Sequence, residues 1–168
     1  MGIILALIEH GSVIVLTILL FAVFSPYNML LGIVLLIFRI GEGSIQFINE
    51  PNYWSLIKIA EHYSVTNGAK KNSLSDLARN KFKTKDIRFK FAMIFWSIGT
   101  LAFSIISVTS EIVPQIVGWL GIISSILVGF GTGIKLLKPK FKGEIIGGLS
   151  AILFEVIIGG YLLFSSLI

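Results

Sequence analysis

Long apolar stretches separated by short polar ones dominate the pattern along this chain. The longest stretches without a charged residue are Gly11–Phe38, Phe91–Ser110, Ile112–Ile134 and Val156–Ile168. A transmembrane helix needs about 20 predominantly apolar residues, so these stretches supply most of the crossings. The pattern predicts an all-α integral membrane bundle, a single domain over residues 1–168 with five transmembrane helices at about 3–24, 27–48, 89–109, 114–137 and 143–167.

A cytoplasmic arm, 49–88, is expected to separate the second and third predicted helices, and the only hydrophilic segment of the chain is Val65–Lys90. Pro51 predicts the end of the second helix, because proline lacks the N–H that a helix interior requires. Residues 51–63 then predict a short amphipathic helix in the membrane interface, with Tyr53 and Trp54 as anchors. The alternative is a simple extension of the second helix. Residues 66–72 are expected to be mobile, and Ser73 is expected to cap a short helix that ends near residue 80.

The composition agrees with a membrane protein. Hydrophobic residues make up 55% of the 168 positions and charged residues only 14%, whereas globular domains are about 25% charged. The chain has no cysteine, which excludes thiol catalysis, disulfides and cysteine metal sites. Its first residues, MGIILAL, lack the basic segment and cleavage site of a signal peptide, so the first helix is expected to insert directly.

The distribution of basic residues predicts the orientation. Of the fourteen Lys and Arg, only Arg39 lies deep inside a predicted helix. The others fall in 58–90 and 135–142, whereas the connections at 25–27 and 110–113 have none. By the positive-inside rule, both basic connections are cytoplasmic. We therefore expect a multi-pass protein of the cell membrane with its N-terminus in the cytoplasm and its C-terminus outside.

Near the end of the hydrophilic segment, Lys and Arg residues alternate with the aromatic residues Phe82 and Phe89. These basic residues are expected to bind anionic lipid headgroups while the rings enter the acyl boundary. The residues are Lys81, Lys83, Lys85, Arg88 and Lys90. The alternative is a mobile cytoplasmic arm whose charges only set the orientation. Basic residues beside a crossing are normally topology signals, so no nucleic-acid partner is expected.

A polar cluster is predicted inside the membrane. Arg39 and Glu42 are three residues apart, which places them on one helix face. A guanidinium near mid-membrane costs roughly 2.5–3.5 kcal/mol, so Arg39 is expected to face the interior and to pair with a carboxylate, from Glu155, Glu42 or Glu9. Three carboxylates oppose one arginine, so one is expected to be protonated or paired with a histidine. The predicted cluster comprises Arg39, Glu42, Glu9, His10, Gln46 and Glu155.

Two functions are compatible with this cluster. Such groups line proton relays and substrate cavities, so one hypothesis is the binding or transport of a small solute or protons around Arg39, Glu42 and Glu155. The other is a non-catalytic structural or accessory subunit of a membrane complex, in which Arg39 is a structural tie. Catalysis is disfavoured because no catalytic motif occurs, and no cofactor or metal ligand set is expected. Adjacent Glu9 and His10 point about 100° apart on a helix, which suits a metal poorly.

Small residues recur at steps of three and four in the fourth and fifth predicted helices. Such spacing lets helix backbones approach closely in lipid, where hydrophobicity does not drive association. The residues are Gly118, Gly121, Ser125, Gly129, Gly133, Gly147 and Gly159. They predict helix packing inside the chain, and they also offer a surface for a homo-oligomer or a partner in a membrane complex. A hinge or an ion path is the functional alternative.

Two short motifs carry a resemblance to a known family. A proline turn leads into Phe38-Arg39-Ile40-Gly41-Glu42, and a later helix begins with Pro114, Gly118, Trp119, Leu120 and Gly121 in a Pro-x-x-x-Gly-Trp-Leu-Gly pattern. Over most of its length the chain resembles a family of multi-pass prokaryotic membrane proteins known as domain of unknown function number 4386. The resemblance implies the Arg-x-x-Glu pair on a central helix and the multi-pass architecture, with no assigned chemistry.

Overall fold

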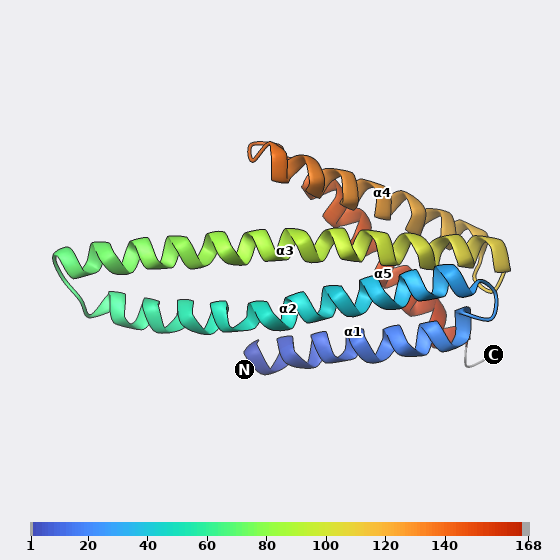
Figure 1. The fold of residues 1–168 in the computed structure, drawn as a ribbon, viewed down its shortest axis with the longest axis horizontal. Helices are drawn as coiled ribbons and strands as arrows, with labels where there is room; N and C mark the ends of the chain where they lie inside the picture. Colours follow the sequence, from blue (N-terminus) through green and yellow to red (C-terminus); the bar gives the residue numbers. More distant parts are fainter. Residues whose placement is uncertain (1, 166–168) are drawn as a thin grey trace.

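The computed structural model describes residues 2–165, which form five α-helices joined by short turns (Figure 1). The helices are α1 (Gly2–Phe24), α2 (Met29–Ser64), α3 (Ala69–Ser110), α4 (Gln115–Leu137) and α5 (Glu144–Ser165). Each is long and apolar enough to span a membrane. The prediction of an all-α protein with five membrane-spanning helices is therefore confirmed. The predicted end of the fifth helix, at residue 167, lies outside the described residues.

The first two helices form the expected antiparallel hairpin. The turn contains Pro26, and α2 begins two residues later than predicted because Asn28 caps it. The Asn28 side chain accepts a hydrogen bond from the backbone N–H of Leu31 at 3.1 Å, which satisfies one of the free donors of the first turn. Asn28 therefore lies directly before α2 and marks where the helix begins.

The segment between the second and third spans is helical except at residues 65–68, which corrects the predicted end of the second helix at Pro51. Helix α2 continues through Pro51 to Ser64, so residues 51–63 are the extension of the second helix and not a separate amphipathic helix. Helix α3 begins at Ala69, directly after Gly68. Ser73 is consequently inside a helix and not an N-cap. The expected mobility of residues 66–72 stays a prediction, although residues 69–72 are helical.

Contacts between α2 and α3 explain why proline does not end the helix. Pro51 has no N–H to donate to the preceding turn, but the carbonyl of Ile48 in that turn accepts a hydrogen bond from Arg88 Nη1 at 3.1 Å. The Asn49 side chain donates to the carbonyl of Lys85 at 3.3 Å. Both bonds join α2 to α3 directly before the proline, and the two helices continue beyond it as a long antiparallel pair.

This helical pair extends beyond the rest of the bundle. Residues 51–64 of α2 add roughly 20 Å at about 1.5 Å per residue. Figure 1 shows the extension projecting past the N-terminus of α1 and past the turn between α4 and α5. The extension and the α4–α5 turn carry the basic residues, so all of them except Arg39 gather at one end of the molecule.

The small residues of α4 and α5 pack mainly inside the chain. A Cβ added at Gly118 would lie 2.6 Å from Val108 of α3, and one at Gly129 would lie 2.8 Å from Ser97 Oγ. Ser125 is buried, and a Cβ at Gly121 would collide with Ser104 and Phe154. Of the α3 residues they meet, Ser97 and Ser104 belong to its Ser/Thr face, which is buried. The members of that face are Ser97, Thr100, Ser104 and Ser107.

Two of the glycines that were predicted to pack against other helices make no close helix contact in this structure. A Cβ at Gly133 or at Gly159 would meet no heavy atom within 4 Å. Gly147 is different, because its Cβ would lie 3.0 Å from the backbone oxygen of Leu127 in α4. The close approach of α5 to α4 therefore includes the basic end, in addition to the contact between Gly121 and Phe154.

Candidate functional site: a polar cleft between α1 and α5

Arg39 of α2 pairs with Glu42 one turn later on the same helix. Arg39 Nη1 lies 2.7 Å from Glu42 Oε2, and the two side chains are 12% and 11% exposed. The two atoms are at ion-pair distance but not in hydrogen-bond geometry, and neither has a hydrogen-bond partner among the described residues. The pairing agrees with the i, i+3 spacing in the sequence, and it leaves hydrogen-bonding capacity of both groups unused.

Helix α3 provides the space for the Arg39 side chain. A Cβ added at Gly99 would lie 2.7 Å from Arg39 Cγ, so only glycine lets the arginine stem lie against α3. Two residues further along α2, Gly41 similarly accommodates the ring of Phe95. These two glycines therefore bring α2 and α3 close together around the charged pair.

Glu155 of α5 extends the polar group across the bundle. Its Oε1 accepts a hydrogen bond from Trp96 Nε1 of α3 at 2.8 Å. No cationic group lies within 4.0 Å of Glu155 in the part of the chain that the structure describes. The carboxylates of Glu155 and Glu9 both lie within electrostatic reach of Glu42.

These residues line a cleft of about 540 Å³ between α1 and α5, with α2 and α3 as its floor. Helix α1 packs on α2 and α5 packs on α4, but α1 and α5 do not pack extensively against each other. Figure 1 shows α5 crossing the layer of α1, α2 and α3 at an angle. The cleft is therefore open at the side, between two helices that would face lipid.

The cleft is amphipathic along its length. Its polar lining lies toward the basic end of the molecule and consists of Glu9, Arg39, Glu42, Gln46, Trp96 and Glu155. Its apolar lining lies toward the opposite end and includes Leu16, Leu20, Leu35, Phe103, Phe154 and Ile158. A molecule with a polar head and an apolar body would match both parts.

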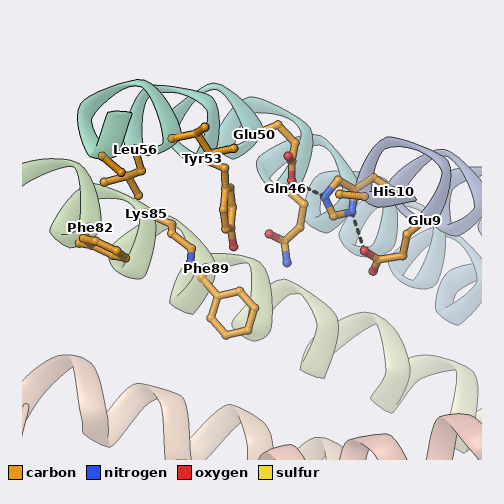
Figure 2. A pocket seen from close by; sticks show the side chains of 12 residues that line it. Glu9, His10, Gln46, Glu50, Tyr53, Leu56, Phe82, Lys85 and Phe89 are labelled. Atoms are coloured by element: carbon orange, nitrogen blue, oxygen red, sulfur yellow. Dashed lines mark hydrogen bonds and ion pairs between the residues drawn. The ribbon is translucent and has the colours of Figure 1, made fainter. Parts of the chain in front are cut away.

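A second cavity of about 740 Å³ adjoins the cleft at the basic end (Figure 2). It lies between the start of α1 and the α2–α3 pair. Glu9, Gln46 and Phe89 line both cavities. The two cavities are therefore neighbours, one around Arg39 and the other at the end of the bundle that carries the basic residues.

His10 is held between two carboxylates in this second cavity. Its Nε2 lies 3.1 Å from Glu50 Oε1 and its Nδ1 lies 3.5 Å from Glu9 Oε2, as Figure 2 shows. Nearby, Lys85 Nζ lies 4.0 Å from the ring centroid of Tyr53. The cavity thus has an acidic side on α1 and α2 and a cation-bearing side on α3.

The predicted polar cluster is divided into two neighbouring groups. Arg39, Glu42 and Glu155 line the deep cleft, whereas His10 pairs with Glu50 nearer the basic end. Glu9 and Gln46 lie between the groups, because both line the cleft and the second cavity.

The residues expected at lipid headgroups have varied surroundings. Lys85 lies over Tyr53, Lys90 pairs with Asp86, and Arg88 donates to a backbone carbonyl. Lys81 and Lys83 make no such contact with the described residues. These intramolecular contacts were not anticipated, because they depend on the unexpected pairing of α2 with α3.

Sequence reasoning missed Trp96 and Glu50. Tryptophan usually lies at the membrane boundary, so its position inside the third predicted span was a signal that the indole N–H needed a partner. Glu50 follows Gln46 by four residues and therefore continues the polar face of α2. The predicted helix end at Pro51 concealed this continuity.

The structure offers no evident site for a metal. Within residues 2–165, no group of three or more His, Cys, Asp or Glu side chains is placed to hold an ion. The chemistry available in the cleft is therefore that of its charged, amide and indole groups.

Comparison with known proteins identifies a family. The family described as "Domain of unknown function (DUF4386)" matches residues 1–165. No curated protein and no solved structure matches the chain.

Proposed function

The chain belongs to the domain of unknown function 4386 family, and we propose that it binds a small solute within the membrane and transfers it through the cleft around Arg39, Glu42 and Glu155. The observation that carries the proposal is the cleft itself. It is a cavity of about 540 Å³ that contains an ion pair and a second carboxylate at the depth of the spans. Charged residues inside a membrane usually face a cavity or pathway.

The adjoining cavity supports a route for the solute. Glu9 and Gln46 line both cavities, so the proposed route runs from the basic end past these two side chains into the cleft. The alternative role as an accessory subunit has less support. Of the glycines that would form its docking face, Gly118, Gly121 and Gly147 are in close contact with other helices of the same chain.

We also propose that the basic end faces the cytoplasm, since the positive-inside rule assigns basic connections to that side. A cysteine at Lys70, near the tip of the α2–α3 extension, is expected to react with an impermeant thiol reagent only from the cytoplasm. One at Gln115, at the start of α4, is expected to react only from outside. The reverse labelling pattern would refute the orientation.

A single cysteine at Ile152 tests whether the cleft is accessible. Ile152 lines the cleft, whereas its neighbour Leu153 lies outside it at the same depth; both are exposed on α5. The natural chain has no cysteine, so each variant carries one reactive group. Maleimides react with the thiolate, which forms where water reaches the sulfur. We expect Ile152→Cys in nanodiscs to react with N-ethylmaleimide at least about tenfold faster than Leu153→Cys, because only the cleft admits water.

Leu153→Cys is the matched control, because it presents the same thiol at the same depth on the lipid side of α5. Equal protection of both cysteines would mean that lipid or packing fills the cleft, and the proposed function would fail.

A further inference from the structure

We infer that the ligand of the cleft is a lipophilic organic cation, such as an ammonium or phosphonium ion with apolar substituents. This inference rests on the proposed function and specifies the substrate class of the same cleft. Three features carry it: the balance of charges in the lining, the apolar far end, and the way the cleft opens.

The lining has an excess of negative charge. It contains three carboxylates, from Glu9, Glu42 and Glu155, and one guanidinium. The charge of Arg39 is offset by Glu42 at 2.7 Å, so the other two carboxylates leave the lining negative. Glu155 has a hydrogen bond from Trp96 but no cationic partner among the described residues. Glu155 is exposed at the cleft, and an unpaired carboxylate inside a membrane is costly, so a bound cation would supply its pair.

The far end of the cleft suits apolar substituents. Beyond Arg39 its lining is aliphatic and aromatic, with Leu20, Phe103 and Ile158 among the residues. Trp96 is buried in the core, and its hydrogen bond to Glu155 holds that carboxylate beside this apolar part. A positive centre near Glu155 with apolar groups toward Ile158 therefore satisfies both halves of the cavity.

The side opening distinguishes a lipophilic cation from a hydrophilic one. A hydrophilic cation entering through the second cavity would first pass the basic end of the molecule, where like charges repel it. A lipophilic cation dissolves in the bilayer and reaches the cleft laterally, because α1 and α5 do not close against each other. An anion is opposed inside the cleft by the same carboxylates that favour a cation.

Two ions of nearly identical shape and opposite charge test the inference. Binding of tetraphenylphosphonium and of tetraphenylborate is measured by equilibrium dialysis against the full chain in nanodiscs, with protein-free nanodiscs subtracted. We expect tetraphenylphosphonium to bind and tetraphenylborate to bind at least tenfold more weakly. Glu155→Gln, which keeps the shape but removes the charge, is expected to weaken tetraphenylphosphonium binding at least tenfold. Glu61→Gln, an exposed carboxylate on the α2–α3 extension, is the control and is expected to change nothing.

Each other outcome overturns the inference. Tighter binding of tetraphenylborate would mean that the cleft selects anions, and the proposed function would survive with another substrate class. Tetraphenylphosphonium binding that is unaffected by Glu155→Gln would place the ion elsewhere. If neither ion binds, the inference fails, and the labelling of the cysteine at position 152, which needs no ligand, decides separately whether the proposed function fails too.

Discussion

Replacing Arg39 with leucine is expected to lower the free energy of unfolding by about 3–5 kcal/mol, because it leaves a buried carboxylate without its cation. The partner is Glu42, whose Oε2 lies 2.7 Å from Arg39 Nη1 and whose side chain is 11% exposed. Leucine fills part of the volume against Gly99 but cannot neutralise the charge. Equilibrium unfolding in bicelles by a denaturing detergent measures the change.

The double variant Arg39→Leu, Glu42→Leu is the control for this prediction. Removing both charges leaves no unpaired ion, so the double variant is expected to recover most of the lost stability. A single variant as stable as the natural chain would contradict the buried pair. A double variant as unstable as the single one would show that packing, and not charge, causes the loss.

Replacing Gly147 with leucine is expected to lower the free energy of unfolding by about 1–3 kcal/mol, because the side chain has no space between α4 and α5. A Cβ there would lie 3.0 Å from the carbonyl oxygen of Leu127 and 3.1 Å from the Cα of Val128. Backbone atoms cannot rotate aside as a flexible side chain does, so the helices must separate. The same bicelle unfolding assay measures the change.

Gly148→Leu is the matched control, one residue further along α5. A Cβ at Gly148 would meet no heavy atom within 4 Å, because this position lines the cleft. Gly148→Leu is therefore expected to leave stability nearly unchanged while it narrows the cleft. Equal destabilisation by both substitutions would contradict the described contact between α4 and α5.

The number and type of helices followed from the sequence, because lipid leaves a chain few choices. Backbone groups must be satisfied within each span, so apolar length alone predicts a crossing helix. The same reasoning failed at Pro51, where the rule for an isolated helix predicted an end. Bonds from Arg88 and Asn49 between α2 and α3 outweigh that local preference. The pattern of apolar and polar positions along the chain does not reveal such long-range bonds.

The candidate site, like the fold, was only partly predictable from the sequence. The Arg39–Glu42 pair was predictable, because an i, i+3 spacing on a helix fixes the two side chains near each other. The pairs His10–Glu50 and Trp96–Glu155 join residues 40 and 59 positions apart, so they depend on how the helices are arranged. The cleft also depends on the angle of α5, which helical periodicity does not specify.

The central claim is that a solute occupies the cleft between α1 and α5, and protection of a cysteine at Ile152 tests it most directly. The labelling rate with N-ethylmaleimide is measured in nanodiscs with and without saturating tetraphenylphosphonium. A cysteine at Lys70, far from the cleft, is the control that shows whether tetraphenylphosphonium slows the reagent itself. We expect the ion to slow labelling at position 152 at least about tenfold and to leave position 70 unchanged, because a bound ion excludes reagent and water from the cleft. An unchanged rate at position 152, at a concentration where the ion is bound, would contradict the claim.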